Sequence, residues 1–276
     1  MSLSPADLDR YFDRIDCDGP RTPTHDALAA IHLAHPQAIP FENLDPLLKR
    51  PVRLDTAALI AKLVDGRRGG YCFEHNLLLK DVLTTLRFNV KGLAARVLWS
   101  RPDVVLPRTH MVLLIDLDGA KHVADVGFGG MTLTAPLRLV CDVAQSTPHG
   151  VYRLIESDGA YTVQAQIGGA WRALYRFDMQ PQLLPDYQVA NWYLCNHPDS
   201  PFLDALIAAR IEAGRRHVLR DNDYAIHEAD GATKRTTLTD ASALRQTLEG
   251  TFGIALPHSP AVAALLDRFV TTRDGG

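Results

Sequence analysis

The chain has 276 residues and a formal net charge of -3 at pH 7, with 46% hydrophobic and 22% charged residues. These proportions are typical of a soluble globular protein and exclude a mainly disordered chain. The small negative charge provides no general attraction for nucleic acid or for an anionic membrane, so we expect neither as a partner. A chain of this length predicts more than one domain.

The cysteine pattern limits the chemistry further. The four cysteines, Cys17, Cys72, Cys141 and Cys195, form no C-x-x-C pair. Their spacing fits neither a disulfide framework nor a structural zinc site, so we expect no metal and a cytoplasmic location. Residues 1–7 show no signal-peptide pattern, and no stretch approaches the ~18 consecutive apolar residues of a membrane span. The oligomeric state is not indicated by any of these features.

The first 87 residues are predicted to form a helical bundle domain. Ser4 and Pro5 are typical of an N-cap and a first helical residue, and apolar side chains follow at helical spacing. The predicted helices begin at Pro5, Thr24, Asp55 and Cys72. The third of them is expected to end at Gly66.

Residues 88–185 are predicted to form an antiparallel β-barrel, because the hydrophobic period changes to two and glycine turns recur. The turns are Asp118-Gly119, Asp158-Gly159 and Gly168-Gly169. The predicted strands are 90–99, 109–117, 121–126, 150–156, 161–166 and 170–177.

Residues 186–276 are predicted to form a linker helix, residues 186–195, followed by an α+β unit. Helices are expected from Asp240 and from Ser259, although the run 203–213 is equally compatible with a helix by propensity. The predicted strands of this unit lie near 204–211, 216–220, 223–228 and 234–238. The fold class is therefore α+β and multidomain.

Cys72 is the first candidate for chemistry, because it follows Gly69-Gly70 and begins a predicted helix. The free N–H groups and positive dipole end of a helix N-terminus favour a thiolate. A catalytic cysteine also needs a base, and that base needs a third group to orient it.

The hairpin around Asp118-Gly119 supplies both groups. A two-residue turn there pairs Leu117 with Ala120, which sets Asp125 diagonally across from His110 on the same face of the two strands. Such neighbours are within reach of a hydrogen bond between the imidazole and the carboxylate. The turn type therefore predicts a triad of Cys72, His110 and Asp125, whereas a three-residue loop would separate the last two.

Each of these residues also has a purely structural interpretation. A cysteine is often a small buried apolar residue, a strand histidine is often satisfied locally, and aspartate is a common turn residue. His75 forms a C-x-x-H pair with Cys72 but lacks further metal ligands, so we interpret it as a packing or polar-face residue. The run 127–130 contains three glycines but no complete phosphate-binding motif.

Several separated blocks resemble the arylamine N-acetyltransferases of bacteria. They are Ile39-Pro40-Phe41-Glu42-Asn43-Leu44-Asp45, Arg68-Gly69-Gly70-Tyr71-Cys72-Phe73-Glu74, Arg108-Thr109-His110-Met111-Val112-Leu113, Asp125-Val126-Gly127-Phe128-Gly129, and Ala190-Asn191-Trp192-Tyr193 with His197-Pro198. The blocks occur in the order of that family and cover most of residues 39–200.

The resemblance implies a helical bundle, a β-barrel and a C-terminal α/β lid, with a cysteine-protease-like triad of Cys72, His110 and Asp125. It also implies ping-pong transfer of an acetyl group from acetyl-CoA, through acetyl-Cys72, to an arylamine, arylhydrazine or N-hydroxyarylamine. Expected CoA contacts are Thr109, Gly127, Phe128 and Gly129. Expected walls of the aryl site are Phe41, Tyr71, Val97 and Phe128.

Two related activities use the same triad: an amide synthase of the same superfamily, and a transglutaminase-like cysteine acyltransferase or hydrolase. A non-catalytic binding module would not need all three triad residues. Glu42 and Arg68 are expected to form a buried ion pair that holds the turn before Cys72. The basic pairs Arg215-Arg216 and Lys234-Arg235 are candidates for CoA phosphate contacts, although basic pairs on strands are usually solvated.

Overall fold

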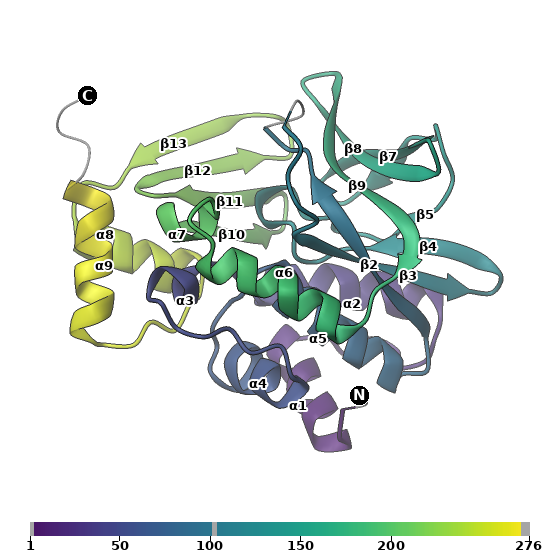
Figure 1. Cartoon of the computed structure of the whole chain (residues 1–276), viewed down its shortest axis with the longest axis horizontal. Coiled ribbons are helices and arrows are strands. Elements are labelled where there is room, and N and C mark those ends of the chain that lie inside the picture. Colours follow the sequence, from purple (N-terminus) through teal and green to yellow (C-terminus); the bar gives the residue numbers. More distant parts are fainter. Residues whose placement is uncertain (1–2, 101–103, 272–276) are drawn as a thin grey trace.

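The computed structural model describes residues 3–100 and 104–271. Helices form the lower layer in Figure 1, the barrel lies above them on one side, and the C-terminal sheet with its helices lies on the other. The outer ends of the predicted domains, residues 1–2 and 272–276, fall outside the described residues. The architecture is α+β, as predicted.

The N-terminal helices begin where their capping residues predict. The side chains of Ser4, Thr24 and Asp55 each accept a backbone N–H in the first turn of the helix that follows. The third predicted helix continues in π geometry from Ile60 and ends before Gly66. The helices are α1 (Pro5–Ile15), α2 (His25–Ala38), α3 (Leu44–Leu47), α4 (Thr56–Leu59), η1 (Ile60–Asp65) and α5 (Cys72–Thr85).

The central strands form one antiparallel sheet in the order β5-β4-β3-β2-β9-β8-β7-β6, which curls into a nearly closed barrel. Both residues of each predicted turn, such as Asp118 and Gly119, have positive φ, as type I′ hairpins require. Gln145 bonds to the backbone of Arg138 across the two edge strands. The strands are β2 (Asn89–Val97), β3 (His110–Leu117), β4 (Ala120–Ala124), β5 (Leu137–Arg138), β6 (Gln145–Thr147), β7 (Gly150–Ser157), β8 (Ala160–Ile167) and β9 (Ala170–Pro181), and η2 is Gly129–Met131.

The C-terminal unit also follows the prediction, and its ambiguous run is resolved. Residues 201–204 form a short helix, and the chain is then a strand from Ile207. The elements are α6 (Leu184–Asn196), α7 (Pro201–Asp204), β10 (Ile207–Glu212), β11 (Arg215–Arg220), β12 (Asp223–Glu228), β13 (Thr233–Thr237), α8 (Ala241–Gln246), η3 (Thr247–Thr251) and α9 (Pro260–Thr271).

Three short strands, β1, β5 and β6, were not predicted. β1 (Phe41–Glu42) lies within the region expected to be purely helical and pairs with β10 at the edge of the C-terminal sheet. Two residues carry no periodicity, so only the distant partner strand defines this element. The predicted N-terminal region therefore contributes directly to the C-terminal sheet.

Buried apolar side chains form three clusters. The first joins the helices to one face of β3 and β4, the second fills the C-terminal unit, and the third fills the barrel. Because side chains alternate along β3, Met111 belongs to the first cluster and Val112 to the third. Among the helices of the described ranges, none has the length and apolar character needed to cross a membrane.

Candidate active site

His110 and Asp125 meet through the hairpin register that the Asp118-Gly119 turn predicts. Leu117 pairs with Ala120, and His110 Nε2 donates a hydrogen bond of 2.7 Å to Asp125 Oδ2. Both side chains are buried, with 2% and 0% exposure. Burial disfavours the imidazolium, but the adjacent carboxylate outweighs it and raises the pKa of His110 to about 10. The contact with Asp125 therefore favours the protonated imidazole in this site.

Cys72 is the first residue of α5, as predicted, and it lies beside His110. Its side chain is almost fully buried, and Sγ lies 3.4 Å from the backbone oxygen of Thr109. Interactions with the Cys72 side chain add to the raised pKa of His110. The helix N-terminus and a neighbouring imidazolium both stabilise negative charge on the sulfur. The structure thus brings the three predicted residues together.

Asn76 holds the carboxylate of Asp125 in place. This role was not predicted from the sequence. Its Nδ2 donates to Asp125 Oδ1 at 2.9 Å and to Met111 O at 2.8 Å, and its Oδ1 accepts the N–H of Val126 at 3.1 Å. Asn76 lies four residues after Cys72, on the same face of α5. That spacing next to a candidate nucleophile is the signal from which sequence reasoning could have found it.

Gly127 allows the Asp125 segment to approach the nucleophile closely. A Cβ at this position would lie 2.8 Å from Cys72 Cα and 3.1 Å from His75 Cβ. The N–H of Gly127 also donates to Asp125 Oδ1 at 2.9 Å. A side chain here would therefore push the carboxylate and the cysteine apart.

Two aromatic rings cover His110 on the barrel side. The Phe128 ring lies 5.0 Å and the Tyr175 ring 4.8 Å from the imidazole, measured between centroids. Burial, together with the charge of Asp125, holds the pKa of Tyr175 well above its usual value. The sequence prediction included Phe128 as a wall residue. It missed Tyr175, which lies on β9, 65 residues after His110 in the chain.

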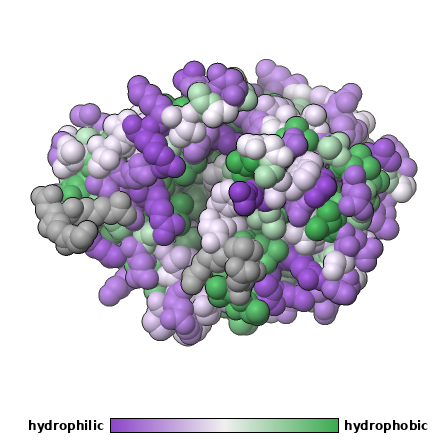
Figure 2. Space-filling view, turned by 90° about the horizontal axis from the view of Figure 1, so that it is seen from above, coloured by the Kyte–Doolittle hydropathy of each residue, from purple (hydrophilic) through white to green (hydrophobic). Residues whose placement is uncertain are grey.

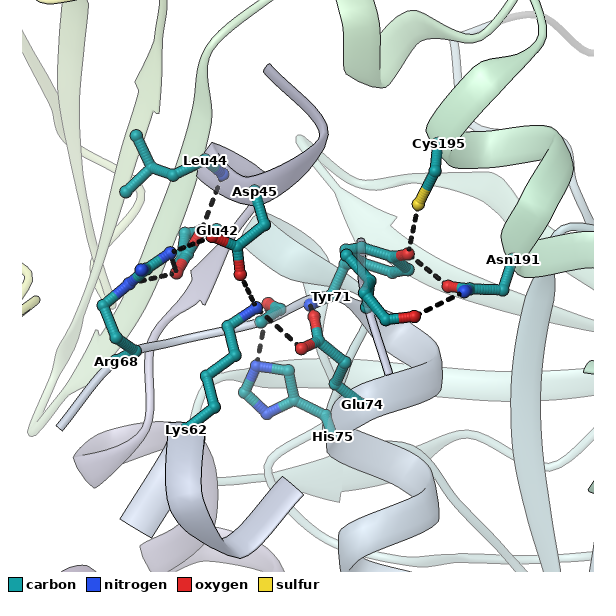
Figure 3. Close-up of polar contacts among 12 residues, drawn as sticks. Glu42, Leu44, Asp45, Lys62, Arg68, Tyr71, Glu74, His75, Asn191 and Cys195 are labelled. Atoms are coloured by element: carbon teal, nitrogen blue, oxygen red, sulfur yellow. Dashed lines mark hydrogen bonds and ion pairs between the residues drawn. The ribbon is translucent and has the colours of Figure 1, made fainter. Parts of the chain in front are cut away.

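The expected Glu42–Arg68 ion pair is confirmed and belongs to a larger network (Figure 3). Arg68 also contacts Asp45 at 3.2 Å, and Lys62 contacts both Asp45 and Glu74 at 2.7 Å. Burial opposes the charge of Lys62, but the neighbouring carboxylates raise its pKa. Glu74 Oε2 accepts the N–H of Tyr71 at 3.1 Å, so the network is attached to the backbone just before Cys72.

Tyr71 lies in the packing behind the turn. Its side chain has no exposed surface, and its hydroxyl contacts Asn191 and the sulfur of Cys195 on α6 (Figure 3). Its ring packs against Phe202. The structure therefore does not support Tyr71 as a wall of an open aryl site.

The other predicted contact residues lie in three places. Phe41 and Gly129 face each other across a space of only about 10 Å³, between the helices and the C-terminal sheet. Thr109 borders a groove of about 330 Å³ beside α6, whose lining includes Tyr187 and Ala190. Val97 is half-buried at the end of β2.

The predicted phosphate contacts are mostly engaged within the protein. Arg216 is buried and donates to the backbone oxygens of Gly130, Thr132 and His149 and to the hydroxyl of Tyr152. Its neighbour Arg215 pairs with Glu228 on the surface. Arg216 therefore attaches the glycine-rich turn of the barrel to the C-terminal sheet. In residues 3–100 and 104–271, no group of three His, Cys, Asp or Glu side chains is placed to hold a metal ion.

Figure 2 shows the face on which the barrel and the C-terminal unit meet, with hydrophilic side chains over much of it and a recess between the two parts. The turn formed by η2 approaches both β10 and β11 at this junction. Gly130 is tightly packed there, because a Cβ would lie 2.9 Å from Val218.

Comparison with known proteins identifies the family. The family described as N-acetyltransferase matches residues 24–261. The arylamine N-acetyltransferase of Mycobacterium bovis is 45% identical over 253 residues, covering 90% of this chain and 89% of the relative. That of Escherichia coli is 41% identical over 250 residues, with the same coverage.

Solved structures agree over nearly the whole chain. The arylamine N-acetyltransferase of Mycobacterium marinum has a TM-score of 0.92 at 40% identity, covering 95% of this chain and 99% of that chain. A structure of the same enzyme in complex with CoA has a TM-score of 0.91 at 41% identity and the same coverage. The resemblance inferred from the sequence blocks is confirmed. The chain belongs to the arylamine N-acetyltransferase family, and the protein is an acyltransferase.

Proposed function

We propose that this protein transfers acetyl groups from acetyl-CoA to aromatic amines or hydrazines through an acetyl-Cys72 intermediate. The observation that carries the proposal is the buried hydrogen bond of 2.7 Å between His110 and Asp125, beside a cysteine at the start of a helix. In this assignment Cys72 is the nucleophile, His110 transfers protons, and Asp125 orients His110 and stabilises its charge.

In the first half-reaction, the Cys72 thiolate attacks the acetyl carbonyl of the thioester. A bond forms between Sγ and the carbonyl carbon, the bond from that carbon to the CoA sulfur breaks, and the leaving CoA thiolate takes a proton from His110. In the second half-reaction, the amine nitrogen attacks acetyl-Cys72 and gives a proton to His110, while Cys72 leaves as a thiolate. The resting imidazolium and thiolate are thereby restored.

The backbone N–H of Cys72 is our candidate for stabilising the oxyanion, since it lies at the positive end of α5. We assign CoA contacts to the predicted glycine turn, Gly127 to Gly129, because it leads from the triad to the junction with the C-terminal sheet. We assign aromatic contacts to Phe128, whose half-buried ring lies against His110. The solved CoA complex of the Mycobacterium marinum relative supports CoA as the carrier of the acyl group.

The test is the intact mass of the protein after incubation with acetyl-CoA alone. We expect addition of one acetyl group, release of free CoA, and loss of the adduct when an aromatic amine is added. Cys72→Ala should form no adduct, whereas Cys17→Ala, which changes a half-buried cysteine in another part of the fold, should react normally. A folded wild-type protein that neither gains mass nor releases CoA would refute the proposal.

A further inference from the structure

A continuous chain of buried hydrogen bonds runs beneath the turn that precedes Cys72. The hydroxyl of Tyr11 on α1 lies 2.8 Å from Nδ1 of His35 on α2, and Nε2 of His35 lies 2.9 Å from Nδ1 of His75 on α5. Nε2 of His75 then lies 3.0 Å from Gly70 O and 3.1 Å from Pro40 O. Tyr11, His35 and His75 are 0%, 0% and 1% exposed.

The acceptors at the end of the chain determine the direction of every bond in it. Carbonyl oxygens only accept, so Nε2 of His75 carries the proton, and Nδ1 of this neutral ring must accept from His35. His35 therefore carries its own proton on Nε2, and its Nδ1 accepts from the hydroxyl of Tyr11. Burial supports these neutral forms, because it lowers the pKa of His75 to about 4 and that of His35 well below its usual value.

The two carbonyls held by His75 join the catalytic turn to the segment before β1. Gly70 N donates to Pro40 O at 3.3 Å, and Glu42 N donates to Gly70 O at 2.8 Å. His75 Nε2 adds a donor to both oxygens at this contact. Gly69 also packs closely against this carbonyl, since a Cβ on Gly69 would lie 2.2 Å from Pro40 O. Cys72 follows Gly70 after a single residue.

The same helix, α2, supports the other half of the site. Nε2 of His32, one turn before His35, accepts the backbone N–H of Asp125 at 3.1 Å. His32 and His35 thus contact the Asp125 segment and, through His75, the turn before Cys72. Both contacts tie the reacting groups to one helix.

We propose that His75 is a positioning residue, and that the chain Tyr11–His35–His75 sets the place of Cys72 relative to His110 by holding the Gly69–Gly70 turn. The inference rests on the proposed role of Cys72 as the nucleophile. A buried polar side chain costs free energy unless it forms hydrogen bonds. An apolar side chain could fill the same space without needing hydrogen-bond partners. At this position the imidazole supplies an N–H donor that is directed at two backbone oxygens.

The test compares His75→Leu, which removes the donor, with His75→Gln, whose amide retains one. The first measurement is the rate of Cys72 acetylation at saturating acetyl-CoA, per folded molecule and well below the unfolding temperature. We expect His75→Leu to be slower by roughly 10- to 100-fold, as for a small displacement of a reacting group. The KM for acetyl-CoA should change little, and His75→Gln should recover most of the rate.

The second measurement is alkylation of Cys72 by iodoacetamide, followed by peptide mass spectrometry. It needs no acetyl-CoA, so it tests the positioning even if the acetyl transfer itself is refuted. The order of rates should again be wild type, then His75→Gln, then His75→Leu. The matched control is His122→Leu, which removes another buried histidine, on β4, that contacts His25 rather than the turn. We expect wild-type rates for the control.

Two outcomes would overturn the inference. One is a His75→Leu protein that reacts at the wild-type rate per folded molecule. This result would mean that the hydrogen-bond chain contributes only to stability. The other is an equal loss in His75→Gln and His75→Leu. If His75→Leu does not fold, Tyr11→Phe serves instead, since it removes only the hydroxyl at the far end. A smaller decrease in alkylation rate then supports the inference, and an unchanged rate contradicts it.

Discussion

Ion pairs between arginine and a carboxylate occur both near Cys72 and on the C-terminal sheet, in opposite environments. At the turn, Arg68 and Glu42 are 12% and 0% exposed. On the sheet, Arg235 and Asp223 are 62% and 37% exposed. A surface pair is screened by water, whereas a buried charge that loses its partner keeps its full desolvation cost. Burial, more than the distance between the charges, therefore decides how much an ion pair contributes to stability.

The largest effect is expected where a buried carboxylate supports a reacting group. Asp125→Asn should lower the rate of Cys72 acetylation by about 10³- to 10⁴-fold with the fold retained, because His110 loses the charge that orients and stabilises it. The rate is measured by quenched-flow mass analysis. Asp116→Asn is the control, as this carboxylate is exposed on the same hairpin. Equal rates in the two variants would remove the distinction between buried and exposed carboxylates here.

The next effect concerns stability. Arg68→Met should lower the free energy of unfolding by about 3–5 kcal/mol, because Glu42 is left as an uncompensated buried charge. Urea denaturation followed by circular dichroism measures it. A loss below about 1 kcal/mol, the usual size for a surface pair, would show that the turn does not depend on this network.

A pH dependence should follow from His110. Its folded pKa of about 10 lies above its ordinary value of 6.5, so its contribution to stability is complete below pH 6.5 and is lost as the pH rises toward 10. As the pH rises from 6.5 toward 10, we expect the unfolding free energy of the wild type to fall relative to that of His110→Phe. Urea titrations at several pH values measure the difference, and a constant difference would contradict the raised pKa.

A smaller effect is expected from close packing alone. Gly127→Ala places a Cβ 2.8 Å from Cys72 Cα and should cost about 1–3 kcal/mol of stability, with slower acetylation. Gly250→Ala, in η3 of the C-terminal unit, has open space around its Cβ and should be neutral or slightly stabilising. Thermal unfolding of both variants checks this, and similar behaviour of the two would count against a tight fit at Gly127.

The smallest effect is expected from the exposed pair. Arg235→Met should change the free energy of unfolding by no more than about 1 kcal/mol, because water already screens its contact with Asp223. The same urea titration serves for Arg235→Met and Arg68→Met. Equal losses would show that burial does not determine the contribution of these ion pairs to stability.

The features that depend on short-range chemistry could be predicted from the sequence alone. Ser4, Thr24 and Asp55 predicted helix starts through their caps, and the Asp118-Gly119 turn predicted the strand register. A two-residue type I′ turn leaves one register, and that register brings His110 to Asp125. The residues next to Cys72 also carried the family resemblance. The nucleophile, base and orienting acid could therefore be proposed without coordinates.

The contacts that join distant segments could be seen only in the folded structure. The pairing of β1 with β10, the bond from Asn76 to Asp125 and the chain from Tyr11 through His35 to His75 link residues 24 to 168 positions apart in the chain. No local pattern encodes such contacts, because they arise when complete helices and strands pack and bury their polar groups. Tyr71 shows the same limit, since its neighbours predicted a site wall and packing against α6 placed it in the core.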